Sequence, residues 1–193
     1  HLLMKRETNK QKTHTGVRII GGSLKRSKLQ VLERDGLRPT PARVRETLFN
    51  WLMPAISGAE IVDCFAGTGV LGLEALSRGA SRCTFVEKDP VVARQIEENL
   101  RRFQRLDQSS ILITDTFDVP AEIFITADII FADPPFHHGM TQEFLTWIHS
   151  QVQPDSRLAI ECEKDEVLNL DGFEVIRELK AGMDWLRLLR PTS

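Results

Sequence analysis

Short apolar runs alternate with amphipathic segments along most of this chain, beginning at about residue 59. The runs have the length of buried strands, and the segments between them repeat apolar positions every three or four residues, as helices do. We predict strands at 60–65, 83–87, 110–114, 128–132 and 157–163, and helices at 69–79, 90–103 and about 140–151. Strands that alternate with helices in this way form a mostly parallel sheet with helices on both faces.

The last two apolar segments break this alternation. Residues 173–180 and 184–190 are joined by a short link that contains glycine, which predicts an antiparallel hairpin. With the five earlier strands they complete a seven-stranded sheet. The predicted fold class is therefore α/β, with a Rossmann-like, mostly parallel sheet that ends in an antiparallel hairpin.

The N-terminal part has a different pattern. Residues 1–16 are polar and basic and lack apolar periodicity, so we expect a flexible tail. Short apolar runs at 17–20 and 28–32 predict a small β-hairpin.

A helix is predicted after this hairpin, which completes a small N-terminal extension of the sheet. Thr40 has the side chain of an N-cap, and Pro41 suits the first helical position. Pro54 is expected to end the helix, because proline cannot donate the next backbone hydrogen bond.

The net charge of −2 hides an uneven distribution of charged residues. Residues 1–45 contain twelve lysines and arginines and three acids, a balance of +9. The remaining residues carry thirteen basic and twenty-four acidic side chains, a balance of −11. Such a basic segment either contacts a polyanion or serves as a solvated tail, and the charge pattern alone leaves both interpretations open. The candidates for phosphate contact are Arg18, Lys25, Arg26, Lys28, Arg38, Arg43 and Arg45.

Composition narrows the class of protein. Of the 193 residues 41% are hydrophobic and 27% charged, as in ordinary soluble proteins. No apolar run approaches the ~20 residues of a membrane-spanning helix. Cys64, Cys83 and Cys162 lie in apolar runs without zinc-site spacing, so we expect buried, reduced thiols and no metal. The polar N-terminus shows no secretory signal, which predicts a cytoplasmic protein.

Acidic residues mark the carboxyl ends of four successive predicted strands. They are Asp63, Glu87, Asp115 and Asp133. Ligands of such sheets bind beyond the carboxyl ends of the strands. Four acids at one edge therefore predict a binding site rather than solvated chain ends.

A glycine-rich loop follows the first of these strands. Its Gly-x-Gly-x-x-Gly pattern at 67–72, with Glu87 twenty residues after its first glycine, has the spacing of an NAD site. The carboxylate of Asp63 would repel the NAD pyrophosphate. S-adenosylmethionine has no phosphate and offers a ribose diol to Glu87, an adenine amine to Asp115 and an ammonium group to Asp63.

The stretch ADIIFADPPF at 127–136 ends a buried strand in a rigid turn, because Pro134 and Pro135 cannot continue the sheet ladder. The Asp133 carboxylate and the Pro134 carbonyl can accept the two N–H groups of an exocyclic base amine. They would thereby direct the nitrogen lone pair toward a methyl donor. Phe136 offers a stacking face. A base inside a duplex could not reach this turn, so the substrate must be unpaired or flipped out.

DPPF resembles the D/N-P-P-F/Y motif of amino-group methyltransferases. Three further blocks, VRIIGG, GLRPTPARVRETLFNWL and DCFAGTGVLGLEALSRGA, resemble the bacterial methyltransferases that modify guanine N2 in 16S ribosomal RNA, and the likeness covers roughly residues 17–190. The resemblance implies a class I S-adenosylmethionine-dependent methyltransferase. Its partner would be 16S ribosomal RNA in a small subunit or an assembly intermediate, and we expect a monomer.

The resemblance also implies roles for individual residues. The reaction site would comprise Asp133, Pro134, Pro135 and Phe136. The cofactor site would comprise Arg38, Thr40, Asp63, Phe65, Gly67, Thr68, Gly69, Glu87 and Asp115. RNA contacts are expected from Arg18, Lys25, Arg26, Lys28 and Arg43. The chain would divide into a tail at 1–16, an extension at 17–54 that contacts RNA and covers the cofactor, and a catalytic domain at 55–193. Phe136 and Thr68 stand where Tyr and Ser are common, and neither change alters the chemistry.

Two other classes of protein remain open. Protein glutamine methyltransferases use the same turn but favour Asn where this chain has Asp133, and the basic N-terminal segment also argues against them. A non-catalytic RNA-binding or NAD-binding module would leave the DPPF turn unexplained. His137 and His138 are interpreted as part of a solvated loop, with substrate contact as the alternative.

Overall fold

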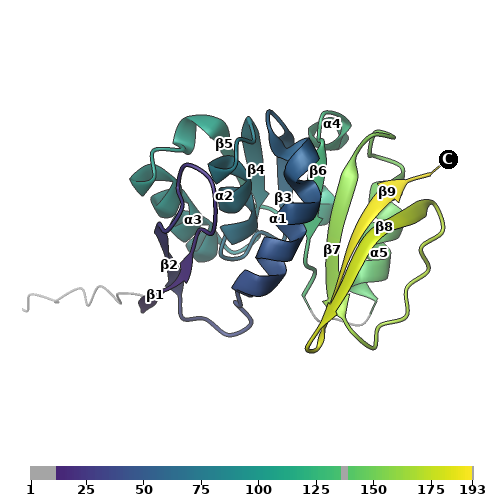
Figure 1. The fold of residues 1–193 in the computed structure, drawn as a ribbon, viewed down its shortest axis with the longest axis horizontal. Coiled ribbons are helices and arrows are strands. Elements are labelled where there is room, and N and C mark those ends of the chain that lie inside the picture. Colours follow the sequence, from purple (N-terminus) through teal and green to yellow (C-terminus); the bar gives the residue numbers. More distant parts are fainter. Residues whose placement is uncertain (1–11, 136–138, 193) are drawn as a thin grey trace, which may run out of the picture.

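A seven-stranded sheet with the order β5-β4-β3-β6-β7-β9-β8 forms the centre of the protein (Figure 1). The computed structural model describes residues 12–135 and 139–192. The strands are β3 (Glu60–Cys64), β4 (Arg82–Val86), β5 (Ser109–Leu112), β6 (Ile129–Ala132), β7 (Arg157–Glu163), β8 (Phe173–Ala181) and β9 (Asp184–Pro191). β3 to β7 are parallel, and β9 pairs antiparallel with both β7 and β8. The predicted sheet is confirmed.

Helices cover both faces of the sheet. They are α1 (Ala42–Ile56), α2 (Val70–Ser77), α3 (Pro90–Arg102), α4 (Ala121–Ile125) and α5 (Met140–His149), with 3-10 turns η1 (Leu106–Gln108) and η2 (Thr116–Asp118). The first three helices pack on one face, and α4 and α5 pack on the other. Strand β6 is buried on both sides, which explains its continuous apolar sequence. No helix in the described part of the chain is long and apolar enough to cross a membrane.

The N-terminal hairpin is a separate two-stranded sheet of β1 (Thr13–Arg18) and β2 (Lys28–Leu32). β1 begins before Val17, so the prediction that the chain is flexible up to residue 16 is wrong for its last residues. Thr13 pairs with Leu32, which shows that backbone pairing extends the strand although its side chains there are exposed and polar. The rest of the expected tail, residues 1–11, lies outside the described residues.

Two predictions about α1 are wrong. Pro41 takes the N-cap position, and the Thr40 hydroxyl instead donates a hydrogen bond to Glu161, 3.5 Å away. The helix also continues past Pro54 to Ile56. Because Pro54 lies in the last turn, its missing N–H removes one hydrogen bond there and leaves the helix otherwise intact.

Glu74 connects the N-terminal segment and α1 to helix α2. Its buried carboxylate accepts hydrogen bonds from the backbone N–H groups of Ile20 at 2.8 Å and Gly21 at 3.0 Å. The guanidinium groups of Arg45 and Arg78 also donate to it, at 3.1 and 3.0 Å. The expectation that Arg45 contacts phosphates is therefore wrong, because its side chain is only 3% exposed and is bound to a carboxylate.

Candidate active site

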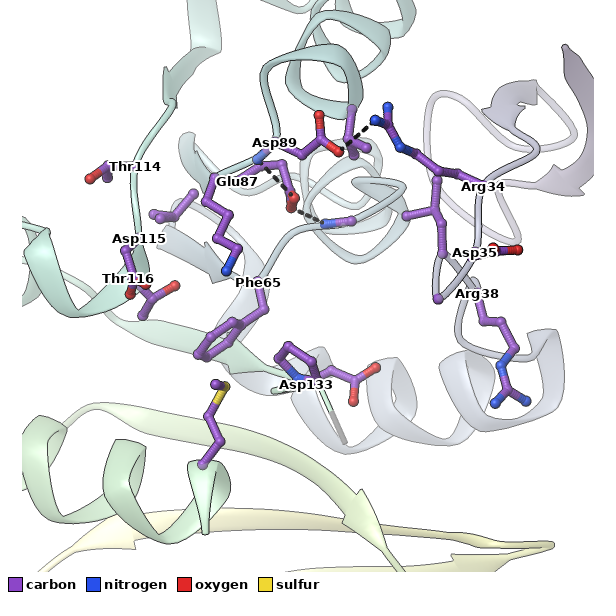
Figure 2. Close-up of a pocket in the computed structure, with 18 of the residues that line it drawn as sticks. Arg34, Asp35, Arg38, Phe65, Glu87, Asp89, Thr114, Asp115, Thr116 and Asp133 are labelled. Carbon is purple, nitrogen blue, oxygen red and sulfur yellow. Dashed lines mark hydrogen bonds and ion pairs between the residues drawn. The ribbon is translucent and has the colours of Figure 1, made fainter. Parts of the chain in front are cut away.

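A cavity of about 320 Å³ lies beyond the carboxyl ends of β3, β4, β5 and β6 (Figure 2). Its walls come from the segments that follow these strands and from the loop between β2 and α1. The lining residues include Arg34, Arg38, Phe65, Gly67, Glu87, Asp89, Asp115, Phe117, Asp133 and Pro135. Open α/β sheets bind ligands in crevices of this kind. The structure thus brings Glu87, Asp115 and Asp133 together, as predicted.

A smaller cavity of about 40 Å³ shares part of this wall. The residues that line both cavities are Arg38, Phe65, Gly67 and Asp133. The smaller cavity is also lined by Thr40, Asp63 and Thr68. All the predicted cofactor residues except Gly69 therefore line one cavity or the other, and Asp133 lies where the two meet.

The glycine loop between β3 and α2 turns through left-handed backbone conformations. Gly67 and Gly69 have φ angles of 56° and 76°, which glycine adopts without steric strain. Phe65 also has a positive φ of 54°, which is unfavourable for a residue with a Cβ atom. Its ring packs edge-on against the rings of Phe117 and Phe144, with centroids 6.4 and 5.7 Å away. These contacts hold the strained residue at the cavity wall.

Asp63 is a buried carboxyl group behind this loop. It is 3% exposed and accepts a hydrogen bond from the Gly72 N–H at 3.2 Å. A Cβ atom at Gly72 would come within 2.4 Å of the Phe85 ring, so glycine is needed for this close approach. Burial raises the pKa of Asp63 well above its ordinary value, and the charges of Glu87 and Asp133 raise it further. A cation bound beside it would favour its ionised form.

Glu87 follows β4 and is oriented by two backbone groups (Figure 2). Its Oε2 accepts a hydrogen bond from the Gly67 N–H at 3.2 Å, and its Oε1 accepts one from the Asp89 N–H at 3.4 Å. Burial raises the pKa of Glu87, and these two hydrogen bonds lower it. Each carboxylate oxygen retains a second lone pair. The group can therefore still accept hydrogen bonds from a diol in the cavity.

Asp115 lies in the loop after β5 and caps the turn η2. Its Oδ1 accepts a hydrogen bond from the Phe117 N–H at 3.0 Å, and the residue is otherwise exposed. The Phe117 ring lines the same cavity. An exposed acceptor beside an aromatic ring suits an aromatic ligand that carries an amine.

Asp133 directly follows β6 and begins the Asp-Pro-Pro turn. Burial raises the pKa of Asp133 to about 7, and Asp184 contributes to this increase whereas Arg38 opposes it. Figure 2 shows Asp133 and Arg38 at the same end of the cavity. A carboxyl group with a pKa near neutrality at a cavity wall is typical of a functional site.

The motif is described only as far as Pro135, which lines the larger cavity. Phe136 lies outside the described residues, as do His137 and His138. The stacking role of Phe136 stays a prediction, and so does the interpretation of the two histidines.

Glu161 is a buried carboxyl group beside Asp133 that the sequence analysis missed. β6 pairs with β7 up to Ala132 and Ile160, and Asp133 and Glu161 are the residues that follow these two. Glu161 is 7% exposed and accepts the hydrogen bond from Thr40 described above. Burial, followed by the charges of Asp133 and Asp184, raises the pKa of Glu161 to about 8. The available signal was an acid inside the apolar run at 157–163.

The predicted RNA-contact residues lie on the N-terminal hairpin and at the start of α1. They are Arg18, Lys25, Arg26, Lys28 and Arg43, and all are exposed. They are therefore free to meet phosphates, whereas Arg45 is not. None of them lines either cavity. Their contact with RNA stays a prediction.

The chain is similar to known proteins over most of its length. The family model described as "Conserved hypothetical protein 95" matches residues 17–190. Ribosomal RNA small subunit methyltransferase D of Escherichia coli strain K12 is 44% identical over 186 residues, which cover 93% of each chain. The protein of the same name from Haemophilus influenzae is 38% identical over 178 residues, covering 89% of this chain and 92% of the relative.

A solved structure agrees with these sequence matches. The putative methyltransferase yhhF from Escherichia coli superimposes with a TM-score of 0.78 at 36% identity, covering 91% of this chain and 97% of that one. The class I methyltransferase fold expected from the sequence blocks is confirmed. The chain belongs to the family described as conserved hypothetical protein 95, together with the methyltransferases D of Escherichia coli and Haemophilus influenzae.

Proposed function

We propose that the protein transfers the methyl group of S-adenosylmethionine to the exocyclic N2 amine of a guanine in small-subunit 16S ribosomal RNA. The observation that carries this proposal is the position of Asp133, directly after a buried strand and where two cavities meet. The names of the relatives, ribosomal RNA small subunit methyltransferase D, support ribosomal RNA as the substrate. We further propose that the reaction takes place in the cytoplasm.

The residues of the two cavities fit S-adenosylmethionine. Asp115 and the Phe117 ring would hold the adenine, and Glu87 would accept the ribose hydroxyls. Asp63 would face the ammonium group, and the Arg38 guanidinium would face the carboxylate of the methionine part. A dinucleotide pyrophosphate would instead meet several acids at this edge, which argues against NAD. When bound, S-adenosylmethionine supplies an electrophilic methyl group.

The Asp133 carboxylate and the Pro134 carbonyl would act on the base amine. In its ionised form Asp133 accepts one N–H while the carbonyl accepts the other, and the nitrogen lone pair is held away from both acceptors. As positive charge develops on this nitrogen, the carboxylate stabilises it and then receives the proton that the nitrogen releases. Burial makes this charge stabilisation stronger than it would be in water.

The exposed basic residues of the hairpin would bind the RNA phosphates. Reversing the charges of Lys25, Arg26 and Lys28 should weaken RNA binding and flatten the dependence of log K on log salt, while cofactor affinity stays unchanged. Replacing the same residues with glutamine should give an intermediate slope. Filter binding at several salt concentrations measures the RNA affinity and its salt dependence. An unchanged slope would mean that these residues do not contact RNA and serve only to keep the protein soluble.

Methyl transfer from labelled S-adenosylmethionine tests the function directly. The protein is incubated with 16S ribosomal RNA, free and in small subunits, and the RNA is digested to nucleosides. We expect label in N2-methylguanosine, a rate lower by about a hundred- to a thousandfold with Asp133→Ala, and wild-type transfer with Asp118→Asn, an exposed acid outside the cavities. Label in another nucleoside or in a protein glutamine would contradict the proposal.

The choice of cofactor has an independent readout. Stabilisation by a ligand grows with its concentration relative to Kd, by about 2.7 kcal/mol at a hundredfold excess. S-adenosylhomocysteine should therefore raise the Tm clearly, and NAD should not. The reverse result would favour a dinucleotide-binding module.

A further inference from the structure

Three carboxyl groups come together at the catalytic edge from three neighbouring strands. Asp133 follows Ala132 of β6, and Glu161 follows Ile160, the partner of Ala132 on β7; paired strands lie about 4.8 Å apart. Asp184 begins β9 opposite Glu163, and alternation along β7 places it on the same face as Glu161. From that position the charge of Asp184 raises the pKa of both other groups.

In the described part of the chain these three acids have no cationic partner of the kind that neutralises Glu74. No salt bridge within residues 12–135 and 139–192 involves Asp133, Glu161 or Asp184. The charge of the exposed Arg38 lowers the pKa of Asp133 only against larger opposing effects. Because neighbouring like charges are unfavourable, the acceptors of Asp133 and Asp184 are expected to be satisfied by donors from a ligand.

We propose that Asp184 selects guanine, by accepting the ring N1–H of the same base whose N2 amine is bound at Asp133. The proposal rests on the function proposed above. In guanine the amine lies next to a ring N–H, so its Watson–Crick edge presents adjacent donors. Adenine and cytosine carry a ring nitrogen lone pair beside the amine, which a carboxylate would repel. Two carboxylates on the same face at this edge are therefore complementary to guanine and to neither of the other amino bases.

Glu161 is the positioning residue for Asp184. It is buried, whereas Asp184 is partly exposed. A hydrogen bond links the carboxyl groups of Glu161 and Asp184, and it favours the neutral form of Glu161. In that form Glu161 donates to Asp184, while its other oxygen accepts from Thr40. Asp184 is thus held with acceptor capacity free for a base.

The test compares guanine with 2-aminopurine at the methylated position. The position is first mapped in 16S ribosomal RNA, and an RNA fragment is then synthesised with either base there. 2-Aminopurine keeps the N2 amine but has a lone pair at N1 instead of a proton. The measured quantity is the ratio of kcat/KM for the two RNAs within each protein variant. This ratio does not depend on the fraction of protein that is correctly folded.

We expect the wild-type protein to prefer guanine by about ten- to a hundredfold, the range of a hydrogen bond to a charged group. Asp184→Asn and Asp184→Ala should reduce this preference to a few-fold, because neither keeps the charged acceptor. Glu163→Gln is the matched control, since Glu163 pairs with Asp184 but is exposed, and it should retain the preference.

The outcomes separate this proposal from the function on which it rests. Methylation of guanine with an unchanged preference in both Asp184 variants would overturn the role of Asp184 and leave the function standing. Equal rates on the two RNAs in the wild type would do the same. Absence of methyl transfer to guanine in the wild type would overturn both.

Discussion

Glu74 and Asp133 are two acidic residues with different surroundings: Glu74 is surrounded by hydrogen-bond donors, whereas Asp133 lines a cavity. Glu74 is fully buried and receives four hydrogen bonds, two from backbone N–H groups and two from arginines. Asp133 is also largely withdrawn from water, but the described part of the chain gives its carboxylate no hydrogen bond, and its pKa rises to about 7. The first acid holds segments together, and the second faces a cavity.

The difference teaches how to recognise a reactive acid in this fold. A buried carboxylate without donors is unfavourable, so a protein that needs it only for structure surrounds it with partners, as around Glu74. Where the partners are missing and a cavity is present, the missing donors are expected to come from ligands. Asp133 meets both conditions, and four changes test the contrast.

The largest effect is expected from Glu74→Ala, which leaves Arg45 buried without its carboxylate. The free energy of unfolding should fall by about 3–5 kcal/mol, the usual result of removing one partner of a buried pair. Urea unfolding followed by circular dichroism measures this loss. Glu97→Ala is the control, because the Glu97–Arg101 pair is exposed and should contribute at most about 1 kcal/mol. Equal stability of the two variants would show that Glu74 is not a structural anchor.

Asp133→Ala should instead spare stability and reduce the chemical step. The single-turnover rate should fall by about a hundred- to a thousandfold, as when a preorganised polar group is lost from a transition state. The single-turnover rate of Asp133→Asn should fall less, since the amide oxygen still accepts one hydrogen bond. Affinities for S-adenosylhomocysteine and RNA should remain close to wild type. A near-normal rate for Asp133→Ala would show that the Asp-Pro-Pro segment is only a structural turn.

Glu87→Ala should weaken S-adenosylhomocysteine binding by about ten- to a hundredfold, because a charged acceptor for the ribose is lost. In the number of hydrogen bonds it receives, Glu87 is intermediate between Glu74 and Asp133, since two backbone N–H groups donate to it. Isothermal calorimetry measures the affinity, and the exposed Glu122→Ala on α4 is the control. Unchanged affinity in a folded Glu87→Ala protein would remove this residue from the cofactor site.

The smallest effects are expected in the pH dependence of the single-turnover rate. Asp133 must be ionised to stabilise the positive charge on the amine and to receive its proton, so the rate should rise as the pH passes through about 7. Asp184→Asn removes a negative charge that raises the pKa of Asp133, so the midpoint should move to lower pH. Arg38→Gln removes a charge that lowers this pKa, so the midpoint should move to higher pH. Shifts in the same direction would mean that another group is titrating.

The sheet and the acids at its edge could be predicted because both depend on local sequence. A strand buried on both faces is continuously apolar, so its end can be recognised in the sequence. The residue after it lies at the carboxyl edge of the sheet, and the positions of Glu87 and Asp133 at that edge were therefore predictable. The glycine loop was also predictable, because close approach requires glycine wherever it occurs, as at Gly72.

The remaining features depend on contacts between distant parts of the chain. Thr40 has the side chain of a helix cap but bonds to Glu161, 121 residues away. Arg45 belongs to a basic segment, yet its partner Glu74 lies 29 residues further on and withdraws it from solvent. Glu161 adjoins Asp133 only because β7 pairs with β6. The local sequence of the two segments does not indicate which strands become neighbours in the sheet.

Arg45 connects three parts of the chain that could otherwise be regarded as separate modules: the hairpin, the cofactor-lining segment and helix α2. Arg45 donates to the carbonyls of Arg18 in the hairpin and Thr40 in the cofactor-lining segment, at 2.9 and 3.0 Å, besides its bond to Glu74. In evolution, positions 45 and 74 are therefore expected to change together or not at all. In engineering, a chimera that exchanges the hairpin for that of a relative should cross over after residue 78, so that the arginine and its acid are inherited from one parent.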